Sequence, residues 1–238
     1  MKKSIIIPLV IIAVSMAFFS CSNAGDGKAE MKAPVENQVK EAGLKTATPM
    51  DKGEAKTKTI ANMQAAFKGE TTASAKYAAY SQKAEQEGFY EIALLFKAAS
   101  ASENIHANNH KAVLQELGVT TPVIKPGYTI KTTKENLAES ITGETYEVTT
   151  MYPEFITTAN AADNQLALIS LNYAYKTEKK HKVFYENALA ALNNNTVKSL
   201  ASVFYLCPTC GNTYETTAPT RCGISMTSGE KFIKINSL

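Results

Sequence analysis

Apolar residues recur every three or four positions along four stretches of the chain, which predicts four amphipathic helices. The stretches are residues 59–88, 92–118, 137–155 and 171–192, and Pro153 is expected to kink the third. Helices that each bury one apolar stripe pack against one another around a common core. The sequence therefore predicts a mainly α protein built on a four-helix bundle.

The connection between the second and third predicted helices is unusually long. It covers residues 119–131 and contains Pro122, Pro126 and Gly127. A hairpin between neighbouring helices needs only a few residues, so this length favours a crossover along the bundle. Thr132 and Glu135 then have the spacing of a capping box at the start of the third helix.

Two Glu-x-x-His motifs lie on the apolar stripes of the second and fourth helices. They are Glu103/His106 and Glu178/His181, in a chain with three histidines. Residues three apart lie on one face of a helix, so each motif directs a carboxylate and an imidazole at the same point. Two such motifs with a glutamate from each of two other helices form the ligand set of a di-iron or di-manganese bundle.

The other two glutamates belong to a repeated Gly-Glu-Thr sequence on the first and third helices. Glu70 and Glu144 are 74 residues apart, whereas the two Glu-x-x-His motifs are 75 apart. Each half of the bundle is therefore predicted to be a helix pair, and two pairs are needed to enclose a metal pair. Gly69 and Gly143 precede these glutamates, and their cost inside a helix suggests that helices approach closely there.

Glutamates on apolar stripes need a compensating positive charge. Burying an unpaired carboxylate costs several kcal/mol, and the same stripes contain few lysines or arginines. Accidental placement would explain one such residue, but not four at matching positions. A metal cluster would supply the missing charge.

Two further residues near these motifs are harder to assign from periodicity. Glu147 lies one position past the stripe of Glu144, so a solvent-facing glutamate and a metal ligand both remain open. His110 lies one turn beyond His106 but has Ala107, not glutamate, three residues before it. We expect His110 to be a core histidine or one that supports a ligand.

The composition changes after residue 195, where a small cysteine module begins. Cys207-Pro208-Thr209-Cys210-Gly211 is a knuckle that directs two thiolates at one ion. Cys222 begins a second knuckle, but Ser225 stands where its second cysteine would be. Outside the cytoplasm, Cys207 and Cys210 could instead form a disulfide.

The N-terminal residues 1–20 have the features of an export signal. Lys2 and Lys3 precede an apolar run that ends at Ser20, directly before Cys21. A small residue followed by cysteine is similar to a lipoprotein signal, in which Cys21 would be lipidated; the alternative is an ordinary cleaved signal. Residues 21–58 are predicted to be a flexible tether, so we expect an exported, membrane-anchored lipoprotein on the periplasmic side or in the cell envelope.

The charge balance gives no reason to expect a nucleic-acid partner. The formal charge is +3 for the whole chain, and removal of Lys2 and Lys3 with the signal would leave +1. A nucleic-acid-binding domain usually carries a pronounced excess of basic residues. We therefore expect no nucleic acid among the partners.

Several of these motifs together indicate a known family. They are Ala66-Phe67-Lys68-Gly69-Glu70, Glu103-x-x-His106-Ala107, Gly143-Glu144-x-x-Glu147, Met151-Tyr152-Pro153-x-Phe155, Glu178-x-x-His181 and Cys207-Pro208-x-Cys210-Gly211. Residues 59–235 resemble rubrerythrin, a ferritin-like di-iron protein with a rubredoxin-like tail. The resemblance implies a bundle over residues 59–195, a metal ribbon over 196–238 and a homodimer.

The resemblance also implies the site residues and the cofactors. Two iron ions would be held by Glu70, Glu103, His106, Glu144, Glu147, Glu178 and His181. Tyr77 and Tyr152 match tyrosines that lie near the cluster and hydrogen-bond its carboxylates. Cys207, Cys210 and Cys222 would hold one iron or zinc ion, with Ser225 or water as a fourth, oxygen ligand.

The implied activity is reduction of hydrogen peroxide to water, as protection against oxidative stress. In the family the rubredoxin-like iron supplies electrons to the di-iron cluster, and the donor to that iron is unidentified here. Two alternatives stay open. One is a ferroxidase or iron-handling protein that uses oxygen, favoured by the loss of the fourth cysteine; the other is a metal-stabilised, non-catalytic module.

Overall fold

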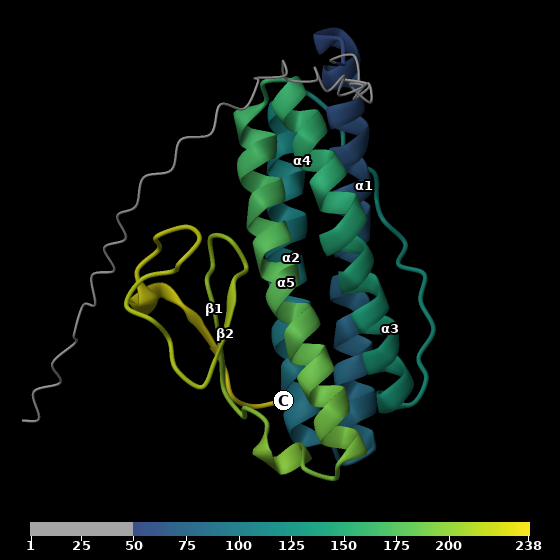
Figure 1. The fold of residues 1–238 in the computed structure, drawn as a ribbon, viewed down its shortest axis with the longest axis vertical. Helices are drawn as coiled ribbons and strands as arrows, with labels where there is room; N and C mark the ends of the chain where they lie inside the picture. Colours follow the sequence, from purple (N-terminus) through teal and green to yellow (C-terminus); the bar gives the residue numbers. More distant parts are fainter. Residues whose placement is uncertain (1–49) are drawn as a thin grey trace, which may run out of the picture. The chain divides into compact units, whose positions relative to one another are not determined.

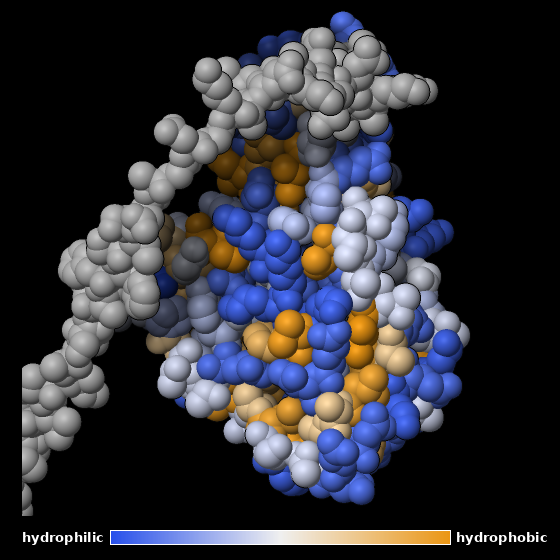
Figure 2. Space-filling model, in the orientation of Figure 1, coloured by the Kyte–Doolittle hydropathy of each residue, from blue (hydrophilic) through white to orange (hydrophobic). Residues whose placement is uncertain are grey.

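The computed structural model describes residues 50–238 of the 238-residue chain. The predicted signal, the lipidation site Cys21 and most of the predicted tether lie outside the described residues. Within the described part, no helix is both long enough and apolar enough to cross a membrane. On the face shown in Figure 2, apolar side chains form separate patches among hydrophilic ones.

Long helices form the bundle, as predicted (Figure 1). They are α1 (Lys52–Gln86), α2 (Tyr90–Glu116), α3 (Thr133–Tyr146), α4 (Tyr152–Ala161) and α5 (Gln165–Asn193). A π-helical segment, Glu147–Met151, joins α3 to α4, so these three segments together make the third helix of the bundle. The mainly α, ferritin-like fold class is confirmed.

The first helix begins earlier than the sequence predicted. Asp51 caps α1, because its Oδ1 accepts hydrogen bonds from the backbone N–H groups of Gly53 (2.9 Å) and Glu54 (3.1 Å). Ala55 is already buried. Residues 52–58 therefore belong to the bundle and not to the tether, a boundary that the weak apolar content of this turn concealed.

The predicted helix ends and the crossover agree with the structure. Gly88 and Gly118 adopt φ angles of 82° and 71° directly after α1 and α2, a conformation that glycine adopts without strain. Residues 119–132 run along the bundle from α2 to α3 (Figure 1). The Tyr80 hydroxyl on α1 holds this crossover against the bundle, because it donates a hydrogen bond to the Thr129 carbonyl (3.1 Å).

A capping box starts α3, as the spacing of Thr132 and Glu135 predicted. The Thr132 Oγ1 accepts a hydrogen bond from the Glu135 N–H (3.3 Å), and Glu135 Oε2 accepts one from the Thr132 N–H (3.2 Å). Pro153 was expected to kink the third helix. The interruption takes the form of the π-helical segment, which ends just before the proline.

Two apolar clusters fill the bundle on either side of a polar centre. One contains Tyr80, Phe96 and Tyr185, and the other contains Met63 and Leu114. The polar residues that lie between the two clusters along α1, α2 and α5 are Glu70, Glu103, His106, Glu178 and His181. The fold therefore encloses the polar groups in the middle of an otherwise apolar interior.

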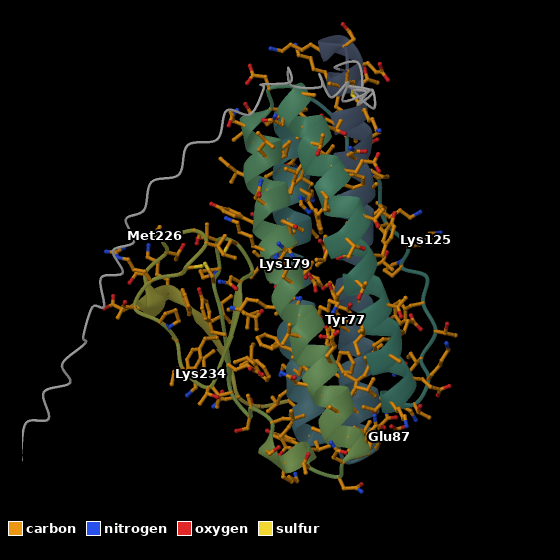
Figure 3. All side chains as sticks on the ribbon, viewed as in Figure 1. Tyr77, Glu87, Lys125, Lys179, Met226 and Lys234 are labelled. Atoms are coloured by element: carbon orange, nitrogen blue, oxygen red, sulfur yellow. The ribbon has the colours of Figure 1, made fainter. Side chains whose placement is uncertain are left out.

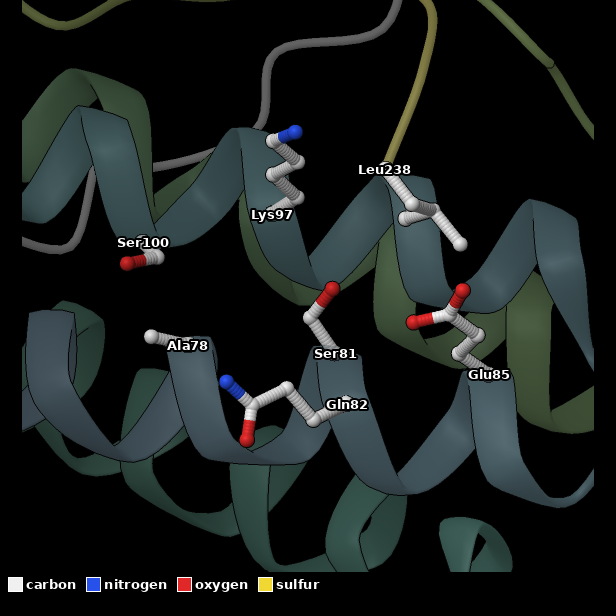
Figure 4. A pocket seen from close by; sticks show the side chains of 7 residues that line it. All are labelled: Ala78, Ser81, Gln82, Glu85, Lys97, Ser100 and Leu238. Carbon is white, nitrogen blue, oxygen red and sulfur yellow. The ribbon is translucent and has the colours of Figure 1, made fainter.

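A small antiparallel sheet forms the C-terminal module. It consists of β1 (Phe204–Leu206), β2 (Thr213–Glu215) and β3 (Ile233–Ile235), with strand order β2-β1-β3. The sheet lies beside α2 and α5 (Figure 1). Leu238 lines a pocket of about 320 Å³ between α1 and α2 (Figure 4), and Lys97 Nζ donates a hydrogen bond to the Ser237 carbonyl (2.8 Å).

Candidate metal centre

Two groups of metal-binding side chains meet in the centre of the bundle. Their members are Glu70, Glu103, His106 and Glu178 for one group, and Glu103, Glu144, Glu178 and His181 for the other. In each group the donor atoms lie within 4.8 Å of one another, and every residue is buried. Glu103 and Glu178 belong to both groups. Two adjacent metal ions would therefore both be held by Glu103 and Glu178.

The ligand atoms lie close together, and one hydrogen bond joins two of them, from His106 Nδ1 to Glu103 Oε2 (2.8 Å). His181 Nδ1 lies 3.0 Å from Glu103 Oε1 and 2.8 Å from Glu178 Oε2. Nevertheless His181 Nδ1, Glu103 Oε1 and both Glu178 oxygens have no hydrogen-bond partner, and neither does Glu144 Oε2. Buried polar atoms nearly always have a hydrogen-bond partner. Several unpaired oxygen and nitrogen atoms in one place therefore indicate a binding site for cations.

The pKa values of the site residues also indicate that the centre lacks positive charge. Burial, followed by the charge of neighbouring glutamates, raises the pKa of Glu70 and of Glu144 well above the usual range. Burial opposes a charge on His181, but Glu103 and Glu178 prevail and raise its pKa to about 9. Without cations the site retains protons, which bound metal ions would displace.

Two buried tyrosines connect the halves of the centre. The Tyr77 hydroxyl on α1 donates a hydrogen bond to Glu144 Oε1 on α3 (2.6 Å), and the Tyr152 hydroxyl on α4 donates one to Glu70 Oε1 on α1. Tyr77 lies in the middle of the bundle (Figure 3). Each tyrosine thus orients a glutamate that belongs to only one donor group.

Glu147 and His110 lie at the edge of the centre. Glu147 is partly exposed and is absent from both donor groups, so the structure does not place this predicted ligand with the others. His110 is buried, with Nδ1 2.7 Å from Ser170 Oγ and Nε2 3.3 Å from the Tyr152 hydroxyl. Burial lowers the pKa of His110 to about 3, so it is a neutral neighbour of Tyr152.

The predicted reason for Gly69 and Gly143 is wrong. A Cβ atom added to either glycine would meet nothing within 4 Å, so no helix approaches closely at these positions. Both glycines instead line a surface groove with Tyr77 and Glu147. The periodicity located these residues on the correct face, but it could not show what lay opposite them.

The cysteine module also forms a cluster of donor atoms. The sulfurs of Cys207, Cys210 and Cys222 lie within 4.8 Å of one another, and these three cysteines of the described part are free, so Cys207 and Cys210 form no disulfide. Ser225 Oγ lies 3.2 Å from Cys207 Sγ. The structure therefore places an oxygen where a fourth sulfur would stand.

The turn after the first knuckle contacts the histidines of both Glu-x-x-His motifs. His106 Nε2 donates a hydrogen bond to the Cys210 carbonyl (3.1 Å), and His181 Nε2 lies 3.0 Å from Thr213 Oγ1. These contacts leave Nδ1 of each ring facing the carboxylates, as expected for a metal ligand oriented from behind. The paired residues are 104 and 32 positions apart, so no local sequence pattern predicts these contacts.

Close approach of the turn depends on Gly211. It has a φ angle of 77°, and a Cβ atom there would lie 2.4 Å from His106 Nε2. Ser102 donates a hydrogen bond to the Gly211 carbonyl (2.7 Å). On the other side, Lys180 Nζ donates to Asn212 Oδ1 (2.8 Å), and burial lowers the pKa of Lys180.

Both donor sets fit the ions that their chemistry suggests. Four buried glutamates and two neutral imidazoles suit two divalent iron or manganese ions, which would balance the carboxylate charge. Three thiolates and one oxygen suit iron or zinc. The fold and the centre therefore define a ferritin-like helical bundle with a dinuclear carboxylate site.

Comparisons with known proteins identify the family. A family model for rubrerythrin matches residues 61–189. Rubrerythrin-2 of Clostridium acetobutylicum is 32% identical over 172 residues, which cover 71% of this chain and 92% of the relative. The chain belongs to the rubrerythrin family.

Further relatives and solved structures agree with this assignment. Nigerythrin of Nitratidesulfovibrio vulgaris is 35% identical over 161 residues, covering 64% of this chain and 74% of that protein. The structure of fully reduced, all-ferrous nigerythrin is 31% identical, covers 74% of this chain and 86% of its own, and has a TM-score of 0.67. Mycobacterium tuberculosis bacterioferritin, 18% identical with a TM-score of 0.56 over 61% of this chain and 95% of its own, supports the fold alone.

Proposed function

We propose that the protein is a di-iron peroxidase that reduces hydrogen peroxide to water, with electrons entering through the cysteine module. The observation that carries this proposal is the direct contact between the two sites. The Cys210 carbonyl and the Thr213 hydroxyl reach the two histidines of the dinuclear centre. An iron-storage or purely structural site has no need of a second metal site at this position.

The side chains around such a centre would have different roles. When bound, two ferrous ions would supply the two electrons that cleave the O–O bond. Glu103 and Glu178 would hold the pair together, because both carboxylates belong to both donor groups. Tyr77 and Tyr152 keep Glu144 and Glu70 oriented and can donate protons to oxygen atoms near those carboxylates. The surrounding apolar clusters exclude bulk water.

Stopped-flow oxidation of the anaerobically reduced protein tests the proposal. We expect hydrogen peroxide to oxidise it much faster than oxygen does, and Glu178→Ala to abolish this reaction while the helical circular dichroism persists. Glu186→Ala, an exposed change on the same helix, is the matched control. Full reaction of Glu178→Ala with peroxide would contradict the assignment.

A ferroxidase is the second candidate, and Ser225 is the observation that favours it. An oxygen beside the three sulfurs is a poorer match to an electron-transfer site than a fourth cysteine. A ferroxidase would react faster with oxygen than with peroxide in the same experiment. A metal that neither oxidant changes would instead favour a non-catalytic module.

We further propose that the mature protein is anchored to a membrane through lipidated Cys21. The support is the sequence Ser20-Cys21 at the end of an apolar run. Cys21→Ser should then yield an unanchored or uncleaved protein in fractionated cells. Recovery of the unmodified wild-type chain in the soluble fraction would count against this proposal.

A further inference from the structure

The groove beside Gly69 and Gly143 is the feature that the proposed function leaves unexplained. It lies between α1 and the segment formed by α3 and the π-helical turn, and its volume is about 330 Å³. The two glycines occupy equivalent positions in the two halves of the chain, each directly before a glutamate of the dinuclear centre. A glycine inside a helix costs about 1 kcal/mol relative to alanine. Neither glycine is required by packing, because a Cβ atom at either position would meet open space.

The groove leads towards the dinuclear centre. Tyr77 forms part of its wall and is 2% exposed, and its hydroxyl donates a hydrogen bond to Glu144. Glu144 in turn has a buried oxygen, Oε2, that lacks any partner. Glu147, the partly exposed glutamate at the edge of the centre, lies on the opposite wall. Molecules in the groove are therefore separated from the centre by only a few side chains.

The volume of the groove is larger than hydrogen peroxide requires. A water molecule occupies roughly 30 Å³ of the liquid, and hydrogen peroxide has only one more oxygen atom. The lining combines alanine and glycine with the stems of Lys68 and Lys76, and Lys76 Nζ lies 5.1 Å from the centre of the Tyr77 ring. These surfaces suit a small molecule with an apolar group and a polar end.

We propose that this groove is the entrance to the dinuclear centre, and that Gly69 and Gly143 keep it wide enough for small organic hydroperoxides. This inference rests on the proposed peroxidase function. In the reaction ROOH + 2e⁻ + 2H⁺ → ROH + H₂O, the O–O bond breaks, two electrons come from the reduced protein and two protons come from solvent. An alkyl group R would occupy the groove while the peroxide oxygens face Tyr77.

Substituting the glycines narrows the groove without disturbing the helices. Gly69→Leu and Gly143→Leu should each fold and unfold at a higher temperature than wild type, because leucine favours helix and its Cβ atom would meet nothing within 4 Å. Thr142→Leu is the matched control, since Thr142 is exposed on α3 and does not line the groove. Each reduced protein is mixed with hydrogen peroxide or with tert-butyl hydroperoxide in a stopped-flow instrument.

We expect wild type and Thr142→Leu to react with both hydroperoxides. The leucine variants should react at least tenfold more slowly with tert-butyl hydroperoxide and be much less affected with hydrogen peroxide. Association of azide with the oxidised protein, followed by absorption, should also slow in the leucine variants only. This second measurement reports access without turnover.

The outcomes separate the two proposals. Equal rates for wild type and leucine variants, in both measurements, would overturn the groove as the entrance. Reaction of wild type with hydrogen peroxide but not with tert-butyl hydroperoxide would overturn the inferred width and leave the peroxidase function intact. Reaction with neither would reject the peroxidase function, and slower azide association in the leucine variants would then still support the entrance.

Discussion

At the scale of single residues, most of the dinuclear centre could be predicted from the sequence. The glutamates and histidines of the two donor groups stand on apolar stripes, where a charge is conspicuous. Lys180, Gly211 and Thr213 could not be found in this way. Their importance comes from contacts between distant parts of the chain. Gly211 belongs to the cysteine knuckle, but its local sequence does not show that it approaches His106. Periodicity left open whether Glu147 faces solvent or the metals. In the structure it is partly exposed and lies at the edge of the centre.

The protonation of the ligands predicts how the metal-free protein responds to pH. The pKa of His181 is raised to about 9 in the folded protein, against an ordinary value near 6.5. A raised folded pKa contributes stability that is fully present below about pH 6.5 and is lost as the pH rises through about 9. Thermal unfolding of chelator-treated protein should therefore occur at a lower temperature at pH 9 than at pH 6.5.

Metal loading should reverse much of that pH dependence, because bound cations replace the protons. The loaded protein should keep a nearly constant unfolding temperature between pH 6.5 and 9. A metal-free protein that is equally stable at both values would show that protons on His181 do not support the fold.

Ser225 is the residue that most clearly sets the properties of the cysteine module. Its Oγ lies near Cys207 Sγ, and an oxygen donor favours Fe(III) over Fe(II). Ser225→Cys should raise the reduction potential of iron in the module and shift its absorption towards that of an all-thiolate site. Ser225→Ala serves as the comparison, since it removes the oxygen without supplying sulfur. An unchanged potential and spectrum in Ser225→Cys would mean that position 225 does not bind the metal.

At the scale of secondary-structure elements, periodicity and turn residues predicted the helices well. The capping box and the glycines that end α1 and α2 depend only on neighbouring residues, so they can be recognised directly in the sequence. The start of α1 was missed because its first turns bury little apolar surface. The docking of the cysteine module was also beyond prediction, since it depends on surfaces contributed by α2 and α5.

The capping box gives a test at this scale. Thr132→Ala removes the side chain that accepts the Glu135 N–H, which should destabilise the protein by about 1 kcal/mol. Urea unfolding of the metal-loaded protein measures the change. Thr142→Ala, in the exposed middle of α3, is the control and should change stability much less. Equal losses in the two variants would argue against a stabilising cap.

At the scale of the whole molecule, the cysteine module and the bundle form one continuous structure. The segment 207–213 carries two of the three thiols and also contacts His106 and His181. The path from the Cys210 sulfur to the dinuclear centre therefore runs through one residue, one hydrogen bond and one imidazole ring.

Gly211 tests whether this contact matters. Gly211→Ala places a methyl group against His106 in a backbone conformation that favours glycine, so the turn must move away. We expect slower reduction of the dinuclear centre by the module, with the metal content of both sites retained. Gly223→Ala, where a Cβ atom would meet only an ordinary contact at 3.8 Å, is the control. Unchanged reduction in Gly211→Ala would show that electrons take another route.

The π-helical segment coincides with a one-residue difference between the two halves of the bundle. Glu70 and Glu144 are 74 residues apart, but the equivalent tyrosines, Tyr77 and Tyr152, are 75 apart. The second half therefore has one residue more than the first between its glutamate and its tyrosine, in the interval that contains the π-helical turn. A π-helical turn holds one residue more than the α-helical turn it replaces. Both tyrosines thus stay within hydrogen-bonding reach of a glutamate from the other half, and the second half has Glu147 where the first has Ala73.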